Sequence, residues 1–160
     1  MTDTPQPPTA TQIYVDADAC PVKQEVVRVA ERHGLTVHMV SNSWMRLPES
    51  PLVDRVVVTD GFDAADNWIA ERIGPTDIAV TADIPLASRC IKAGALVIGN
   101  TGKPFTPEGI GMALAMRDLM QHLRETGEMQ GGNASFSRAD RSRFLESMET
   151  AIQAIKRERT

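Results

Sequence analysis

The chain has 160 residues, of which 42% are hydrophobic and 24% are charged, and its net charge is −4. This length and apolar content suffice for the core of one ordinary domain, which excludes general disorder. No apolar run approaches the roughly 20 residues that a membrane-spanning helix needs. The acidic balance argues against a polyanion binder that depends on bulk positive charge, but it does not exclude a nuclease with acidic metal ligands.

Residues 1–12 are polar and rich in proline, and they lack the basic and apolar regions of a signal peptide. Two cysteines, Cys20 and Cys90, are too few for a disulfide framework, and no CxxC pair offers zinc two thiolates. We therefore expect a disordered tail over 1–12 and a single domain over 13–160. A reducing cytoplasm is the expected location, with no membrane contact.

Short β-favouring runs alternate with helical periodicity through the first hundred residues. The pattern predicts strands at 13–15, 35–40, 55–58, 77–80 and 95–98, and helices from Pro21 to Gly34, over 63–73 and over 85–93. Two amphipathic helices, over 107–124 and 138–157, follow around a glycine-rich loop at 127–137. Strands separated by helices need crossover connections. The expectation is a three-layer α/β fold with a mostly parallel, five-stranded sheet flanked by helices.

A polar residue follows each expected strand. These residues are Asp16, Asn42, Asp60, Asp83 and Asn100. Each one alone has another explanation, because Asp and Asn also begin turns and cap helices. In parallel sheets, however, ligands bind beyond the carboxyl ends of the strands. Three acids among five such positions, with no similar pattern at the opposite strand ends, favour a shared site.

Clustered aspartates repel one another unless a cation neutralises them or some stay protonated. Oxygen ligands without histidine or cysteine favour Mg²⁺ or Mn²⁺, and such sites typically hydrolyse phosphoryl or phosphodiester groups. The candidate metal ligands are Asp16, Asp18, Asp63, Asp66 and Asp83. All of them except Asp63 are also candidate catalytic residues.

The five acids have competing local roles. Asp16 and Asp18 alternate along an expected extended segment, which would point both side chains the same way, although Asp18 could instead cap the next helix. Asp63 and Asp66 share the first turn of a helix, where Asp63 is a candidate N-cap. Asp83 has capping of the helix at 85–93 as its alternative role.

Basic side chains that could contact a substrate phosphate are Lys23, Arg89 and Lys103. Lys103 follows Gly102 in a loop at the expected carboxyl edge. Each of the three is also explained as an ordinary solvated surface charge.

The segment 15–23, Val-Asp-Ala-Asp-Ala-Cys-Pro-Val-Lys, resembles the opening motif of the YaiI/YqxD family of bacterial proteins. Further blocks agree: Asp63-Ala64-Ala65-Asp66, the run 81–87, Gly102-Lys103-Pro104, and Phe136-Ser137 with Asp140, Arg141 and Phe144. That family is grouped with PIN-like domains, which are metal-dependent nucleases. The resemblance implies strand order 3-2-1-4-5, which would place Asp16 beside Asp83. It also implies Asp16, Asp66 and Asp83 as core ligands, with Asp18 close.

We therefore expect metal-dependent hydrolysis of phosphodiesters in RNA or single-stranded nucleic acid, with Mg²⁺ or Mn²⁺ as cofactor. One alternative is a phosphatase of the haloacid dehalogenase type, because Asp16-x-Asp18 after a strand looks like its nucleophile and acid. The helix expected at Pro21 leaves no room for the usual flap, and no paired acidic motif follows Asp83.

The other alternative is a non-catalytic, metal- or partner-binding PIN-like module. The negative net charge and the absence of an aromatic stacking platform weaken the case for RNA binding. A homodimer is conceivable, since an exposed C-terminal helix could pair two chains.

Overall fold

The computed structural model describes residues 10–127 and 136–158 of the chain. Its sheet contains β1 (Gln12–Asp16), β2 (Thr36–Ser41), β3 (Val53–Val57), β4 (Ile78–Val80), β5 (Leu96–Ile98) and β6 (Pro104–Phe105). The order is β3-β2-β1-β4-β5-β6, and the first five strands are parallel. The expected order of five strands is confirmed, and β6 adds a short antiparallel edge beside β5.

The described residues also form five α-helices and one short 3₁₀ turn, and the last two helices follow the sheet. They are η1 (Ala17–Ala19), α1 (Lys23–His33), α2 (Ala64–Arg72), α3 (Ile84–Lys92), α4 (Ile110–Glu125) and α5 (Arg138–Glu158). Helix α1 begins two residues after the expected start at Pro21, because η1 and a turn occupy the segment that follows β1. Of the expected tail, residues 1–9 lie outside the described residues, and so does most of the loop at 127–137.

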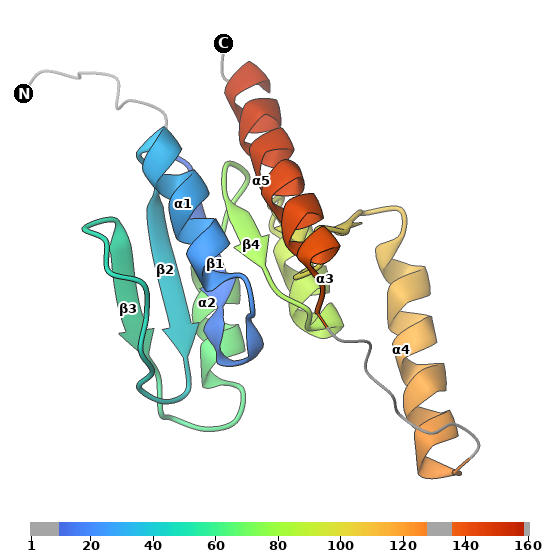
Figure 1. The fold of residues 1–160 in the computed structure, drawn as a ribbon. Coiled ribbons are helices and arrows are strands. Elements are labelled where there is room, and N and C mark those ends of the chain that lie inside the picture. The colour runs from blue at the N-terminus through green and yellow to red at the C-terminus, as the bar shows by residue number, and fades with distance from the viewer. Residues whose placement is uncertain (1–9, 128–135, 159–160) are drawn as a thin grey trace, which may run out of the picture.

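The sheet is covered on both faces, which gives three layers. Alternate residues of β1 point to opposite faces, as the pleat of a strand requires. Ile13 and Val15 belong to the core beneath α1 and α5, whereas Tyr14 belongs to the core beneath α2 and α3. Figure 1 shows α1 and α5 in front of the sheet and α2 and α3 behind it.

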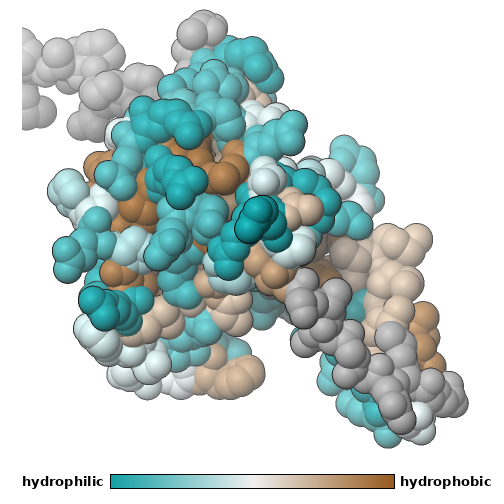
Figure 2. All heavy atoms as spheres, viewed as in Figure 1, coloured by the Kyte–Doolittle hydropathy of each residue, from teal (hydrophilic) through white to brown (hydrophobic). Residues whose placement is uncertain are grey.

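The two C-terminal helices have opposite environments. Helix α5 packs against α1 through Phe144, Met148 and Ile152, which are at most 1% exposed, while its outer face is exposed, as the amphipathic pattern predicted. Helix α4 projects from the body instead, and none of its residues is buried (Figures 1 and 2). Within the described ranges, no helix has the length and apolar character needed to cross a bilayer.

Candidate functional site

The carboxyl ends of β1 and β4 meet at the centre of the sheet. Val15 is paired with Val80, so the next residues, Asp16 and Thr81, leave the two strands side by side. The Thr81 hydroxyl donates to Oδ2 of Asp16 at 2.9 Å and accepts from the backbone N–H of Asp83 at 3.0 Å. One buried hydroxyl therefore joins the acids that follow two neighbouring strands.

Asp16 and Asp66 ionise less readily than ordinary aspartates. Burial raises the pKa of Asp16, and the charges of Asp83 and Asp18 raise it further against the hydrogen bond from Thr81. Burial likewise raises the pKa of Asp66 to about 6, with contributions from Asp83, Asp16 and Asp63. The structure thus brings the acids of β1, α2 and β4 into one electrostatic neighbourhood.

Asp83 combines its two expected roles. Its Oδ1 accepts a hydrogen bond from the backbone N–H of Leu86 at 3.0 Å, which caps α3. Its charge nevertheless acts on both Asp16 and Asp66. Capping fixes the direction of the carboxylate, and a carboxylate oxygen can accept further bonds or bind a cation.

Asp18 does not lie on an extended segment beside Asp16, so that part of the sequence prediction is wrong. The chain turns into η1 directly after β1, which breaks the alternation of side chains. Oδ2 of Asp18 accepts from the backbone N–H of Asn42 at 3.0 Å, and no side chain caps α1. Asp18 therefore ties η1 to the end of β2, with its charge still close enough to act on Asp16.

Asp63 is exposed at the N-cap position of α2 and makes no capping hydrogen bond with its side chain. Its charge contributes to the raised pKa of Asp66. Asp60 is exposed and is not among the groups that raise the pKa of Asp16 or Asp66.

The three basic candidates lie in different places. Arg89 donates to Oδ1 of Asn67 at 2.8 Å, and its charge lowers the pKa of Asp66, so it borders the acids. Lys23 lines a cavity at the start of α1, where its Nζ donates to the carbonyl of Cys20 at 2.6 Å. Lys103 lines a separate cavity against α5 and is not among the groups that perturb the acids.

The donor set can be tested against a divalent cation. Over residues 10–127 and 136–158, no three His, Cys, Asp or Glu side chains gather closely enough to hold a metal by themselves. Mg²⁺ usually keeps several water ligands and binds through one or two carboxylates. Two carboxylates such as Asp16 and Asp83 would suit only a largely hydrated Mg²⁺ or Mn²⁺, because an ion enclosed by protein ligands needs more donors than gather in the described residues.

Sequence reasoning missed two polar contacts at this edge. Thr81 lies two residues before Asp83, and this Thr-x-Asp spacing is the signal that could have identified its bridging hydroxyl. Asn100, at the end of β5, donates from Nδ2 to the carbonyl of Ala19 at 3.3 Å. Its buried Oδ1 accepts no hydrogen bond from any described residue.

Two aromatic side chains were also missed. Trp44 follows β2 and is 69% exposed, and Phe62 follows β3 and is 95% exposed. Both loops leave the carboxyl edge of the sheet, the edge that carries the acids. The small number of aromatic residues in the sequence did not predict that two of them are exposed near this edge.

Comparison with known proteins finds many relatives. A model of the family described as "Uncharacterized BCR, YaiI/YqxD family" matches residues 14–154. A UPF0178 protein of Parvibaculum lavamentivorans is 65% identical over 147 residues, which is 92% of this chain and 97% of the relative. A UPF0178 protein of Agrobacterium fabrum is 59% identical over 150 residues, which is 94% and 98% of the two chains. No solved structure matches this chain.

Proposed function

The chain belongs to the YaiI/YqxD family, and we propose that it is a metal-dependent nuclease that hydrolyses phosphodiesters in single-stranded nucleic acid. The observation that carries this proposal is the Thr81 hydroxyl, which joins the carboxylate of Asp16 to the backbone N–H of Asp83 at the carboxyl edge of a parallel sheet. Such an edge is where α/β proteins bind their ligands.

The proposed roles follow from the positions of the side chains. Asp16 and Asp83 would hold Mg²⁺ or Mn²⁺, which supplies an activated water and stabilises the leaving oxygen. Asp66 faces the same neighbourhood and would orient that water or complete the ligand shell through it. Asp18 and Asp63 would add negative charge at longer range, and Arg89 would offset charge on the substrate.

The crowding of the acids supports a cation there. Three of the groups that raise the pKa of Asp66 are other carboxylates. Like charges held together in this way destabilise the folded protein unless a cation neutralises them. A divalent ion would relieve the repulsion and at the same time provide the chemistry.

The experiment is a calorimetric titration with Mn²⁺, comparing the wild type with the double variant Asp16→Asn/Asp83→Asn. We expect saturable binding that the double variant loses. The matched control is Asp118→Asn, because Asp118 is exposed on α4 and remote from the edge. Equal binding by the wild type and the double variant would remove the site from consideration.

Turnover is then tested on labelled single-stranded RNA and DNA with Mg²⁺ or Mn²⁺. We expect Asp16→Asn to lose at least about 100-fold in rate, since even residues that only support metal ligands contribute 10–100-fold. Cleavage by Asp16→Asn at the wild-type rate would show that the assignment is wrong.

A second candidate function is a non-catalytic, metal- or partner-binding module. The observation on its side is that no three metal-ligating side chains gather in the described ranges, which weakens the case for a catalytic metal centre. Mn²⁺ binding without turnover on any strand would support it. The phosphatase alternative is not favoured, because Asp18 bonds to the backbone of Asn42 and does not stand beside Asp16. Formation of an acyl-phosphate on Asp16 would identify that activity.

A further inference from the structure

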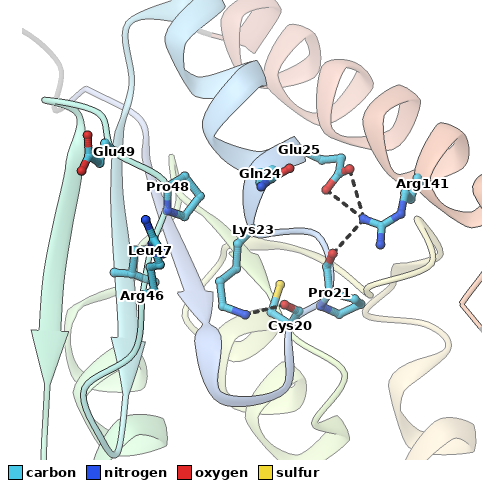
Figure 3. A pocket seen from close by; sticks show the side chains of 10 residues that line it. All are labelled: Cys20, Pro21, Lys23, Gln24, Glu25, Arg46, Leu47, Pro48, Glu49 and Arg141. Carbon is cyan, nitrogen blue, oxygen red and sulfur yellow. Dashed lines mark hydrogen bonds and ion pairs between the residues drawn. The ribbon is translucent and has the colours of Figure 1, made fainter.

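A cavity of about 670 Å³ lies between the start of α1 and the loop that joins β2 to β3. Figure 3 shows that α1 supplies Lys23 and Glu25, the loop supplies Arg46 and Glu49, and α5 supplies Arg141. The wall on the side of β1 is Cys20. Three elements that are distant in sequence thus meet around one polar hollow.

Some of the charged side chains that line this cavity are paired with each other, and others are not. Arg141 donates to Glu25, with an N–O distance of 3.2 Å, and to the carbonyl of Pro21 at 2.9 Å. Glu25 is only 8% exposed, so its negative charge is directed at Arg141 and not at solvent. Three cations and two carboxylates line the cavity, which leaves one positive charge in excess.

Arg46 is the cation that remains available. It is exposed on the loop, and it makes no hydrogen bond or ion pair with any residue that the structure describes. A guanidinium binds the oxygens of a phosphate through two parallel N–H donors, which suits this position to an anionic ligand. Lys23, in the first turn of α1, adds a second positive charge to the cavity.

Trp44 lies two residues before Arg46 on the same loop. It is 69% exposed, and the guanidinium carbon of Arg55 lies 4.8 Å from its ring centroid. Arg55 covers one face of the indole and holds it in place, while the high exposure leaves the rest of the ring to solvent. An exposed, supported indole two residues from a cavity-lining arginine is a suitable surface for stacking a nucleobase.

The loop is connected to the acidic edge by a direct hydrogen bond. The backbone N–H of Asn42, where the loop begins, donates to Asp18. Cys20, in the wall of the cavity, belongs to the segment that directly follows Asp16 in the chain. The segment 17–22 therefore separates the cavity from the acids by a single stretch of backbone.

We propose that the loop between β2 and β3 binds a single-stranded nucleic acid, with a backbone phosphate in the cavity at Arg46 and Lys23 and a base stacked on Trp44. This inference rests on the proposed nuclease function, because it identifies how the substrate strand is held beside the acids. The phosphate in the cavity is not the scissile one, since the segment 17–22 lies between the cavity and Asp16.

The test uses a short oligoadenylate RNA in the presence of EDTA, so that binding is measured without cleavage. The chain has two tryptophans, and Trp68→Phe leaves Trp44 as the only indole. We expect saturable quenching of the remaining emission as the RNA binds. Binding with unchanged emission would overturn the stacking of a base on Trp44, and a lack of binding would overturn the whole inference.

Substitutions test the two contacts separately. We expect Trp44→Ala to weaken binding by about 5- to 150-fold, the usual range for one stacked base, and Trp44→Phe to retain most of the affinity. Arg46→Ala should weaken binding and lower the slope of log affinity against log salt by about 0.7, the value for one phosphate contact on a single strand. The matched control is Arg28→Ala, which removes an exposed arginine of α1 that does not line the cavity. Equal effects of Arg46→Ala and Arg28→Ala would overturn the phosphate contact.

The same variants separate this inference from the nuclease proposal. If Arg46→Ala and Trp44→Ala weaken RNA binding but no metal produces cleavage, the strand-binding loop stands and the nuclease fails. If the wild type cleaves RNA and both variants keep its KM, the nuclease stands and the strand-binding loop fails.

Discussion

The Thr81 hydroxyl, just after β4, donates a hydrogen bond of 2.9 Å to the carboxylate of Asp16 at the end of β1. The same oxygen accepts from the backbone N–H of Asp83. Because Thr81 is 1% exposed, water cannot readily replace either contact. The positions of two acids that end or follow neighbouring strands therefore depend on one hydroxyl group.

Thr81→Val should therefore destabilise the fold. The isosteric change leaves the Asp16 carboxylate and the N–H of Asp83 without this partner, and the loss of such a buried hydrogen bond costs about 1–3 kcal/mol. Thr81→Ser keeps the hydroxyl and should be milder. Urea denaturation at neutral pH measures both variants, and equal losses for the two would show that the hydroxyl is not what matters.

Asp66→Asn should stabilise the metal-free protein at neutral pH. A carboxyl whose pKa is raised from 3.8 to about 6 binds protons more tightly in the folded state, so its ionisation opposes folding. The resulting loss of stability is absent below about pH 4, grows as the pH rises to about 6, and is complete above it. After allowance for solvent screening we expect about 1 kcal/mol, or a Tm increase of about 2–4 °C at pH 7.5 in EDTA.

Asp60→Asn is the control for this effect, because Asp60 is exposed at the same edge and is not among the causes of the shift. Calorimetric melting from pH 4 to 8 should show a growing advantage of Asp66→Asn and none of Asp60→Asn. A constant difference across this range would contradict the electrostatic cause.

The sequence alone predicted the central part of the sheet and its acidic edge. Alternation of strands and helices forces parallel crossovers, and the resemblance supplied the order that places Asp16 near Asp83. Strand β6 was missed because its two residues, Pro104 and Phe105, are too few to show a period. A proline is also tolerated there because β6 is an edge strand.

Other errors came from features that local patterns do not contain. Alternation along 16–18 assumed that the strand continues, but the chain turns into η1, and Asp18 bonds to the loop after β2. The helices α4 and α5 are both amphipathic in sequence, and only tertiary packing determines that α5 has a buried face and that α4 has no buried residue. Trp44 was overlooked because exposure is likewise a tertiary property.

Gly102→Ala should destabilise the protein strongly. Gly102 has a φ of +88°, and an added Cβ would lie 2.5 Å from the carbonyl carbon of Arg143 in α5. Ser147 also donates a hydrogen bond from its hydroxyl to the carbonyl of Gly102, which holds the loop against the helix.

The control is Gly34→Ala, because Gly34 has a φ of +68° but an added Cβ would meet nothing within 4 Å. This variant should lose only about 1–2 kcal/mol of stability, the cost of a left-handed residue. Chemical denaturation should show a larger loss for Gly102→Ala, and equal losses would mean that the contact relaxes.

Glu149→Gln should weaken the attachment of α5 to α1, and the effect should depend on pH. Hydrogen bonds from Gln153 and His33 are the main causes that lower the pKa of Glu149 from 4.5 to about 2. A depressed carboxyl pKa contributes stability that is fully present above pH 4.5 and is lost as the pH falls towards 2. Because the side chain is 31% exposed, we expect Glu149→Gln to lose about 1 kcal/mol of stability at pH 7, and this loss should disappear near pH 2.

Urea denaturation of the wild type and Glu149→Gln at both pH values measures this difference in stability. The control Glu31→Gln, at an exposed position of α1, should show no difference from the wild type. A difference between wild type and Glu149→Gln that persists at pH 2 would mean that packing, and not the charge, is responsible.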